Sequence, residues 1–269
     1  MRKPLVALAA AICLTFAAAG TASAAPTWAP ASTAPIHPGV QTDTQGAQCT
    51  ANFVYYDASN IYIGQAAHCA GTGGNTETDG CTAGTRPVGT PVTVDGASKP
   101  GTLAYSSWAT MQANGESDPD TCAYNDISLI RLDPADATKT NPTVPFWGGP
   151  TGLTDTTAQG DTVLSYGNSS LRAGVTALSP KQGVSLGQSG GGWTHEVYTV
   201  SPGIPGDSGS GFMDKSGKAF GVLSTLQLAP KPAANGVSDL SRMLTYMRTH
   251  GGPDVTLANG TESFSGPLL

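Results

Sequence analysis

Charged side chains are scarce in this 269-residue chain, since only 12% of the residues are Asp, Glu, Lys or Arg. Acidic residues outnumber basic ones, 19 to 13, so the formal net charge is −6. No basic stripe is available to neutralise phosphates, which disfavours nucleic acid as a partner. Turn formers are abundant instead, with 35 glycines and 20 prolines. This composition favours short strands joined by turns, and an extracellular rather than a cytosolic setting.

Long hydrophobic runs are also lacking beyond the first 24 residues. The chain begins with two cations, an apolar run and then small residues that end at Ala22-x-Ala24. This order is typical of a secretory signal peptide over residues 1–24, whereas a membrane anchor would have a longer run with a charged stop. We therefore expect a secreted protein with no membrane contact after cleavage. Loss of Arg2 and Lys3 leaves 11 cations against 19 acids, a formal charge of about −8.

Cysteine is scarce as well, and one of the five, Cys13, lies in the predicted signal peptide. The remaining four are Cys49, Cys69, Cys81 and Cys122. An even number in an oxidising compartment indicates two disulfides, and three pairings are possible. No C-x-x-C spacing indicates a zinc site. The loop GNTETDG at 74–80 offers calcium three oxygen ligands, but such loop carboxylates are mostly solvated, so no metal and no cofactor is predicted.

Beyond Cys49 the chain is a succession of short β-branched or aromatic runs, such as NFVYY, DISLIRL, DTVLSYG and HEVYTV. Turn residues separate the runs at intervals of roughly ten residues, which is typical of a sandwich or barrel. The run GFMDKSGKAFGVLST predicts a hairpin that turns at Lys215–Gly217. Residues 25–46, rich in Pro, Ala, Thr and Gln, are predicted to be an N-terminal arm or a short pro-segment. The fold class is therefore all-β.

One segment, SDLSRMLTYMRTHGG, predicts a helix over about 238–250. Its apolar residues recur at helical spacing on one face: Leu240, Met243, Leu244 and Met247. Ser238 is the predicted N-cap, and Gly251 the stop signal.

The stretch GIPGDSGSG at 203–211 is either a flexible linker or a rigid turn that presents Ser208 as a nucleophile. A nucleophilic serine needs a base. Of the four histidines, His68 follows the apolar run YIGQAA and is the candidate. Asp126 opens the apolar run DISLIRL, where a buried carboxylate needs a hydrogen-bonded partner.

The blocks QAAHC, NDISLIRL and GDSGSG, in this order, resemble the three signature blocks of trypsin/chymotrypsin-type serine proteases, in particular their secreted bacterial branch. His68 and Asp126 are 58 residues apart, and Asp126 and Ser208 are 82 apart. The resemblance extends over roughly residues 40–248. It implies two antiparallel Greek-key β-barrels with a C-terminal helix.

The same resemblance implies a protease domain at 47–250, with its two barrels divided near 140–155 and a C-terminal tail at 251–269. It also implies the disulfides Cys49–Cys69 and Cys81–Cys122.

The resemblance gives each site residue a role. Ser208 is the nucleophile, His68 exchanges its proton, and Asp126 orients His68. The backbone N–H groups of Gly206 and Ser208 form the oxyanion hole, where a side chain on residue 206 would obstruct the turn. The implied activity is serine endopeptidase hydrolysis of peptides or proteins by a monomer, through an acyl-enzyme.

Two features depart from the animal enzymes of this family. No IVGG-like N-terminus is present to pair with Asp207, and Arg172 is the alternative partner that we consider. Pro202 stands where trypsin-like enzymes have an acid that binds Lys or Arg. Leu226 falls where trypsin has a glycine, two residues after Ser224 on the strand that pairs with substrate. These three residues predict a short apolar pocket and cleavage after small or medium apolar residues.

Three alternatives concern His195, the match GQSGG and the N-terminus. If the enzyme prefers to cleave after Glu, His195 is the first residue to test as the group that binds the glutamate side chain. The match GQSGG at 187–191 fits an α/β-hydrolase elbow, but the next residues predict a strand where that fold needs a helix. The absent activating N-terminus keeps open a catalytically inactive protease fold that only binds.

Overall fold

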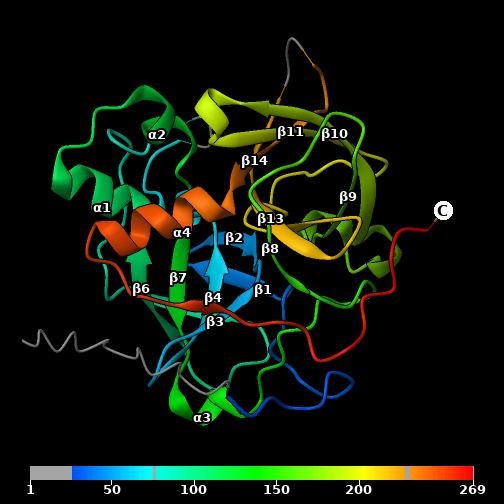
Figure 1. Ribbon diagram of the computed structural model, residues 1–269. Helices are drawn as coiled ribbons and strands as arrows, with labels where there is room; N and C mark the ends of the chain where they lie inside the picture. Colours follow the sequence, from blue (N-terminus) through cyan, green and yellow to red (C-terminus); the bar gives the residue numbers. More distant parts are fainter. Residues whose placement is uncertain (1–25, 75–76, 228–230, 269) are drawn as a thin grey trace, which may run out of the picture.

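The computed structural model describes residues 26–74, 77–227 and 231–268, so the predicted signal peptide and Asn75 of the 74–80 loop lie outside the described residues. The described chain folds into two β-sheets that lie side by side, one mostly from each half of the sequence (Figure 1). The predicted all-β class is confirmed.

The first sheet has eight strands in the order β15-β3-β4-β7-β6-β5-β1-β2, and all of its neighbouring strands are antiparallel. Its strands are β1 (Gln41–Thr44), β2 (Ala47–Thr50), β3 (Val54–Tyr56), β4 (Ile61–Gln65), β5 (Pro91–Val94), β6 (Gly101–Ser106), β7 (Ser128–Arg131) and β15 (Thr256–Leu257). Among the described residues no ladder joins β15 to β2, so this half is an open half-barrel.

The second sheet closes on itself. Its order is β12-β9-β10-β11-β14-β13-β8, and an additional β12–β13 pairing completes a six-stranded barrel with β8 attached outside. Its strands are β8 (Gly152–Leu153), β9 (Thr162–Tyr166), β10 (Pro180–Ser189), β11 (Thr194–Thr199), β12 (Gly211–Asp214), β13 (Lys218–Leu226) and β14 (Asn235–Asp239). The antiparallel β12–β13 pair is the predicted hairpin, with its turn at Lys215–Gly217.

The predicted C-terminal helix is α4, Leu240–Thr249. Its N-cap is Asp239 rather than the predicted Ser238, because the Asp239 side chain accepts a hydrogen bond from the backbone of Arg242 while Ser238 ends strand β14. Three further helices were not predicted: α1 (Ser107–Asn114), α2 (Pro119–Tyr124) and α3 (Pro134–Ala137). Short 3-10 helices are η1 (Ala67–Ala70), η2 (Ser170–Arg172), η3 (Thr176–Leu178) and η4 (Gly190–Gly192).

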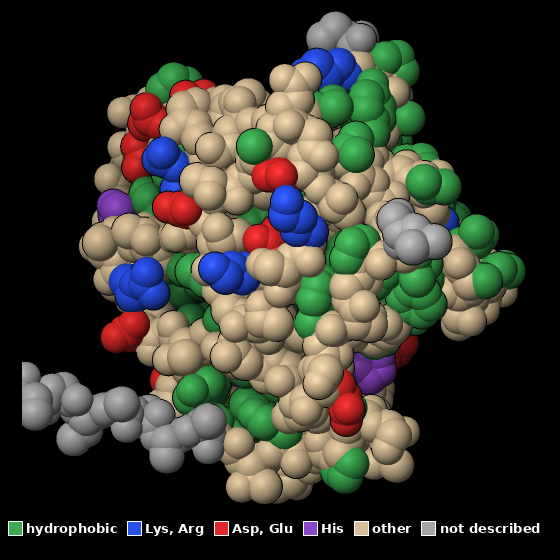
Figure 2. All heavy atoms as spheres, turned by 45° about the vertical axis from the view of Figure 1, so that its right-hand side comes forward, with side chains coloured by type: hydrophobic (Ala, Val, Ile, Leu, Met, Phe, Trp, Pro, Cys, Tyr) green, Lys and Arg blue, Asp and Glu red, His purple; other side chains and the backbone are tan. Residues whose placement is uncertain are grey.

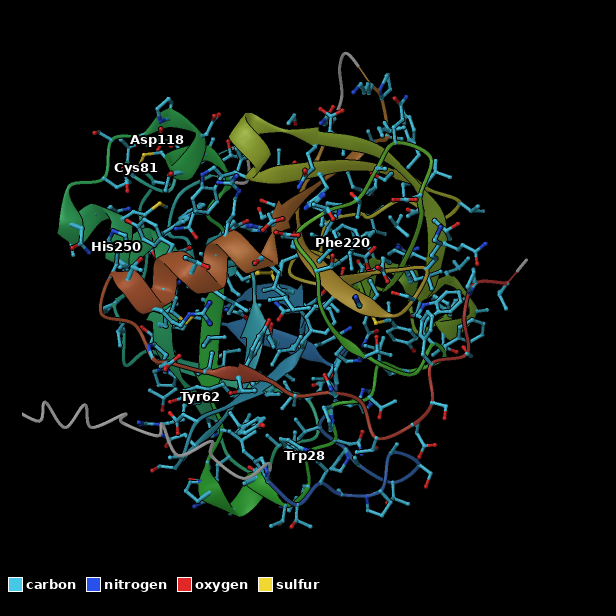
Figure 3. All side chains as sticks on the ribbon, viewed as in Figure 1. Trp28, Tyr62, Cys81, Asp118, Phe220 and His250 are labelled. Carbon is cyan, nitrogen blue, oxygen red and sulfur yellow. A yellow bond between two sulfur atoms is a disulfide. The ribbon has the colours of Figure 1, made fainter. Side chains whose placement is uncertain are left out.

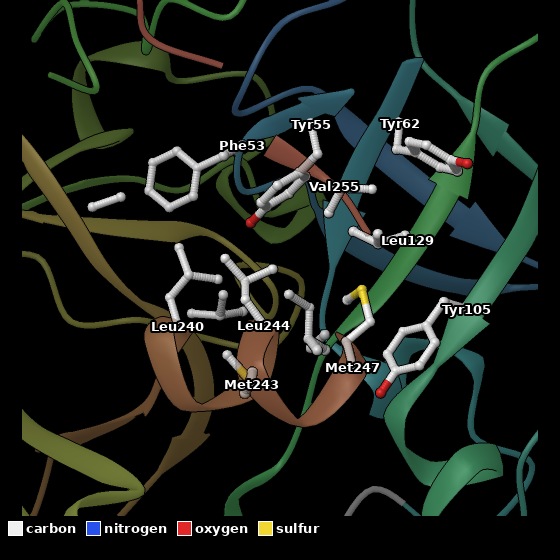
Figure 4. Packing of buried hydrophobic residues seen from close by; sticks show 14 of the residues in the cluster. Phe53, Tyr55, Tyr62, Tyr105, Leu129, Leu240, Met243, Leu244, Met247 and Val255 are labelled. Atoms are coloured by element: carbon white, nitrogen blue, oxygen red, sulfur yellow. The ribbon is translucent and has the colours of Figure 1, made fainter. Parts of the chain in front are cut away.

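Helix α4 packs its apolar face into a core shared by both halves. Figure 4 shows Leu240 and Leu244 directed from the helix toward Phe53 and Tyr55 of the first half, and Met247 toward Leu129. All these side chains are buried. Each such side chain stabilises the fold by about 1.5–3 kcal/mol relative to its exposed state, so this core fixes the first half against the second.

The two ends of the described chain dock on the body. In the N-terminal arm Ile36 is fully buried and Trp28 packs edge-on against Tyr56, at the lower end of Figure 3 where Trp28 is labelled. Residues 251–268 cross the first sheet as β15, which pairs with β3, and then return to the second half. There the backbone N–H of Ser265 donates to the carbonyl of Trp147.

Both disulfides implied by the resemblance are present. Cys49–Cys69 joins β2 to η1 with a Cα–Cα distance of 6.2 Å. Cys81–Cys122 joins the loop before β5 to α2, with 5.2 Å between the Cα atoms.

Candidate active site

Strand pairing brings His68 and Asp126 together. Gln65 at the end of β4 lies opposite Ser128 at the start of β7. His68 follows Gln65 by one 3-10 turn, and Asp126 precedes Ser128 by two residues. The His68 Nδ1 atom lies 2.7 Å from Asp126 Oδ2, and the His68 backbone N–H donates to Asp126 Oδ1 at 2.8 Å. One carboxylate therefore fixes both the ring and the backbone of the histidine.

Ser224 of the second barrel reaches the same carboxylate. Its hydroxyl donates to Asp126 Oδ2 at 2.6 Å. Asp126 is buried, so its three hydrogen bonds replace the hydration that it loses. Asp126 is thus held from both halves of the molecule.

This pairing shifts both pKa values. Burial alone would lower the pKa of His68, but the charge and hydrogen bond of Asp126 outweigh it, and the pKa is raised. Burial alone would raise the pKa of Asp126, but its contacts with His68 and Ser224 leave it lowered. Near neutral pH the carboxylate is ionised and stabilises a proton on the ring.

The Ser208 turn packs against the segment that leads to His68. The backbone N–H of Thr50 donates to the Ser208 carbonyl at 2.8 Å. A Cβ on Gly209 would lie 2.8 Å from the backbone nitrogen of Ala66, two residues before His68. Among the described residues no hydrogen bond joins Ser208 Oγ to His68 Nε2. Such bonds are often long in unliganded enzymes and tighten with substrate.

Two backbone N–H groups of this turn are free. Within the described chain, neither the N–H of Gly206 nor that of Ser208 donates to another group, whereas those of Asp207, Gly209 and Ser210 do. Gly206 has φ +93°, which favours glycine. A Cβ there would lie 3.1 Å from the backbone Cα of Ser169 as well as 2.5 Å from Gln48 Oε1, so a side chain would crowd both neighbours. The turn can present two free donors to an anion.

Asp207 is buried beneath the turn against two cations. Arg172, the partner considered from sequence, donates to Asp207 Oδ2 at 2.5 Å. Lys181, which the sequence reading missed, places its Nζ 3.0 Å from the same oxygen and also donates to the carbonyls of Ser201 and Pro202. Burial lowers the pKa of Lys181, and Asp207 offsets this only in part.

The three residues assigned to the pocket lie in different settings. Ser224 is engaged with Asp126. The Pro202 carbonyl accepts from Arg172 and Lys181. Leu226 ends β13 with 41% of its surface exposed, opposite Asn235 of β14. Asn235 was not singled out in the sequence, because one asparagine next to a glycine indicates only a turn.

The other histidines lie outside this site. His195 is fully buried, with Nε2 2.9 Å from Asp239 Oδ2 and Nδ1 2.8 Å from Thr157 Oγ1. His250 stacks on Tyr246 at the end of α4. The GQSGG match ends in η4 and leads directly into strand β11, so the helix that an α/β-hydrolase elbow needs does not follow it.

Residues 77–80, the described part of the candidate calcium loop after Gly74, belong to the first half and lead into Cys81. Figure 3 places Cys81 and Asp118 of this region well away from Phe220 in the second barrel. Asp79 Oδ1 accepts a hydrogen bond from the Cys81 backbone, an ordinary turn contact. The groups of potential ligands around Cys49, Cys69, Cys81 and Cys122 are not metal sites as they stand, because all four thiols are in disulfides.

The surface and the helices add two observations. On the face in Figure 2, Lys and Arg side chains are spread apart, and several lie beside Asp or Glu. No helix in the described ranges has the length and apolarity to cross a lipid bilayer.

Comparison with known proteins identifies the fold. No family model matches the chain, and no curated protein matches it. Among solved structures, Thermobifida fusca protease A has a TM-score of 0.53 at 18% identity, covering 84% of this chain and 99% of its own. Nocardiopsis protease has a TM-score of 0.51 at 16% identity, and the match covers 82% of this chain and 98% of the protease. A glutamic-acid-specific serine protease, described as using a histidine triad in substrate binding, has a TM-score of 0.51 at 16% identity. This match covers 83% of this chain and 100% of the protease. The fold is that of the bacterial chymotrypsin-like serine proteases.

Proposed function

We propose that this chain is a secreted serine endopeptidase that works as a monomer, without metal or cofactor, through Ser208, His68 and Asp126. One observation carries the proposal: the His68–Asp126–Ser224 hydrogen-bonded chain stands beside a serine turn that has two unpaired N–H donors. A structural histidine can also pair with a buried carboxylate, as His195 does with Asp239, but it has no need of two free N–H donors on a neighbouring serine turn.

The reaction follows from this arrangement. Ser208 Oγ attacks the carbonyl carbon of the scissile peptide, and His68 Nε2 takes the hydroxyl proton. The N–H groups of Gly206 and Ser208 donate to the oxyanion that forms, an interaction worth about 10²–10³ in rate per donor. His68 then gives its proton to the leaving amine. Water, deprotonated by His68, releases the acyl group and restores Ser208.

We also propose cleavage after small or medium apolar residues. Pro202 offers no charge to a Lys or Arg side chain of the substrate. The glutamate preference named for one neighbour is not proposed for this chain. His195, the residue that we would test for it, has both ring nitrogens bonded inside the barrel.

The decisive experiment is labelling of the mature protein with a fluorophosphonate probe, which reacts only with an activated serine. We expect the wild type to be labelled, Ser208→Ala and heat-unfolded protein not to be, and Ser210→Ala to be labelled as the matched control. His68→Ala and Ser208→Ala should each lower kcat by several decades, and the double variant should be little worse, because the two act as a unit.

A folded wild type that is not labelled would contradict the proposal. The alternative, a protease fold that binds without cutting, would then stand. Near-additive losses in the double variant would instead contradict the assignment of the pair.

A further inference from the structure

Residue Asn235 lies opposite Leu226 in the antiparallel β13–β14 ladder. Residues directly opposite each other in such a ladder place their side chains on the same face of the sheet. Leu226 was expected to limit the substrate pocket, yet it is 41% exposed whereas Asn235 is only 1% exposed. Asn235 therefore occupies the deep position and Leu226 the outer one.

The Asn235 amide bridges the two walls of the expected pocket. Its Oδ1 accepts from the backbone N–H of Gly203 at 2.8 Å. Its Nδ2 donates to the carbonyls of Thr225 at 3.2 Å and Gly203 at 3.4 Å. Gly203 belongs to the 202–204 wall, and Thr225 to the β13 wall, so one side chain ties the walls together.

The Gly203 backbone packs closely against this amide. A Cβ built on Gly203 would lie 2.6 Å from Leu223 Cδ2 and 3.0 Å from Asn235 Nδ2. Leu223 and Asn235 therefore occupy the space beside Gly203, where a substrate side chain that entered this deeply would have to lie. The amide has also satisfied its main donors and acceptor, so it presents neither a charge nor a strong unpaired group to a substrate.

We propose that Asn235, rather than Pro202 or Leu226, sets the depth of the pocket and limits the residue before the scissile bond to alanine-sized side chains. This inference rests on the proposed endopeptidase function and deepens it. Asn235 is a specificity-determining residue: it closes the floor sterically and leaves it neutral, while Leu226 only borders the entrance.

The test compares kcat/KM on matched peptide substrates ending in Ala and in Phe, for the wild type, Asn235→Gly, Leu226→Gly and the double variant. The wild type should prefer Ala. Asn235→Gly should raise the Phe/Ala ratio by about 100-fold, because one methylene in an apolar pocket is worth about 10–200-fold and this substitution removes the whole side chain that closes the floor. Leu226→Gly alone should change the ratio by less than about tenfold.

Asn235→Ser is the control for a folding defect in Asn235→Gly, because the serine hydroxyl can still bond to Gly203. This variant should also raise the Phe/Ala ratio, but by less than Asn235→Gly. A wild type that is labelled by fluorophosphonate yet cleaves best after Phe overturns the inference and leaves the proposed function standing. So does a ratio that moves with Leu226→Gly and not with either Asn235 variant. A wild type that neither labels nor cleaves any substrate overturns the proposed function itself.

Discussion

The pKa of His68 governs the pH range in which the proposed enzyme works. Neutral His68 must accept the Ser208 proton, so activity falls as the pH falls through this pKa. Asp126 raises the pKa above its ordinary value of 6.5, despite burial. We therefore expect the acidic limb of kcat/KM against pH to have its midpoint above 6.5.

Removing the Ser224 hydroxyl tests the origin of this limb. Ser224→Ala deletes a hydrogen bond that lowers the pKa of Asp126, so the carboxylate charge acts more strongly on His68. The limb should move to higher pH, whereas Ser241→Ala in α4 should leave it in place. A limb at or below the ordinary histidine value would contradict the coupling between Asp126 and His68.

The buried charges around Asp207 give a second prediction at this scale. Asp207→Asn leaves two cations, Arg172 and Lys181, buried without their anion, and should cost about 3–5 kcal/mol in unfolding free energy. Lys181→Met leaves one anion with one cation and should cost only about 1–2 kcal/mol. Urea unfolding measures both values. An equal loss in the two variants would show that net charge in the cluster does not decide its stability.

Some of these residues were readable from sequence and others were not. His68 and Asp126 stand in distinctive local patterns, so their contact could be expected, and the pattern around Ser208 made it the proposed nucleophile. Lys181 stands in SPKQGVSL, where a lysine normally points to solvent. Its burial depends on Asp207 and on two carbonyls from a distant loop, and no local pattern records those partners.

At the scale of elements, the start of α4 has a double task. Asp239 caps the helix through Oδ1 and contacts His195 Nε2 through Oδ2, 2.9 Å away. Asp239→Ala loses a cap, about 0.5–2 kcal/mol, and leaves a buried ring nitrogen unpaired, about 1–3 kcal/mol. Asp239→Asn can keep both contacts and should cost far less. Unfolding curves that rank these two variants equally would contradict the double role.

Ser238→Ala tests whether Ser238, the N-cap predicted from sequence, contributes to the stability of α4, whose observed N-cap is Asp239. Ser238 is fully buried, and its hydroxyl has no hydrogen-bond partner within the described chain. The substitution should therefore change stability by less than about 0.5 kcal/mol, whereas the loss of a true cap would cost more.

The elements that sequence missed are short helices. Helix α4 has a regular apolar face, which made it predictable. In α1 only Ser107, Trp108 and Met111 are buried, too few for a helical period to stand out from the preceding strand. Helix α2 did carry a start signal, because Asp118 caps it and Pro119 occupies its first turn. The same Asp-Pro signal begins α3, where Asp133 is the N-cap and Pro134 lies in the first turn, and it was overlooked at both positions.

At the scale of the whole molecule, two disulfides close loops of different length. Cys49–Cys69 spans 20 residues and Cys81–Cys122 spans 41. By chain entropy, replacing each pair with alanines should cost about 3 and about 4 kcal/mol respectively, with the longer loop losing more. Chemical denaturation measures the losses, and non-reducing peptide mapping checks the pairs. Finding Cys69 joined to Cys81 would contradict both pairings.

The candidate site also depends on how the halves are held together. Asp126 comes from the first half, while Ser224 and Ser208 come from the second, so a slight displacement between the halves would separate the residues of the proposed triad. The core that both halves share under α4 opposes such a displacement.

Strand β15 imposes an order on biosynthesis. It is the last strand of the chain, yet it covers the outer edge of β3 in the half that is synthesised first. During translation β3 emerges long before residues 256–257, so this edge of β3 stays unpaired until β15 is synthesised. An unpaired edge is a template for wrong partners. A chain truncated before β15 would therefore keep this edge of the first sheet open to aggregation.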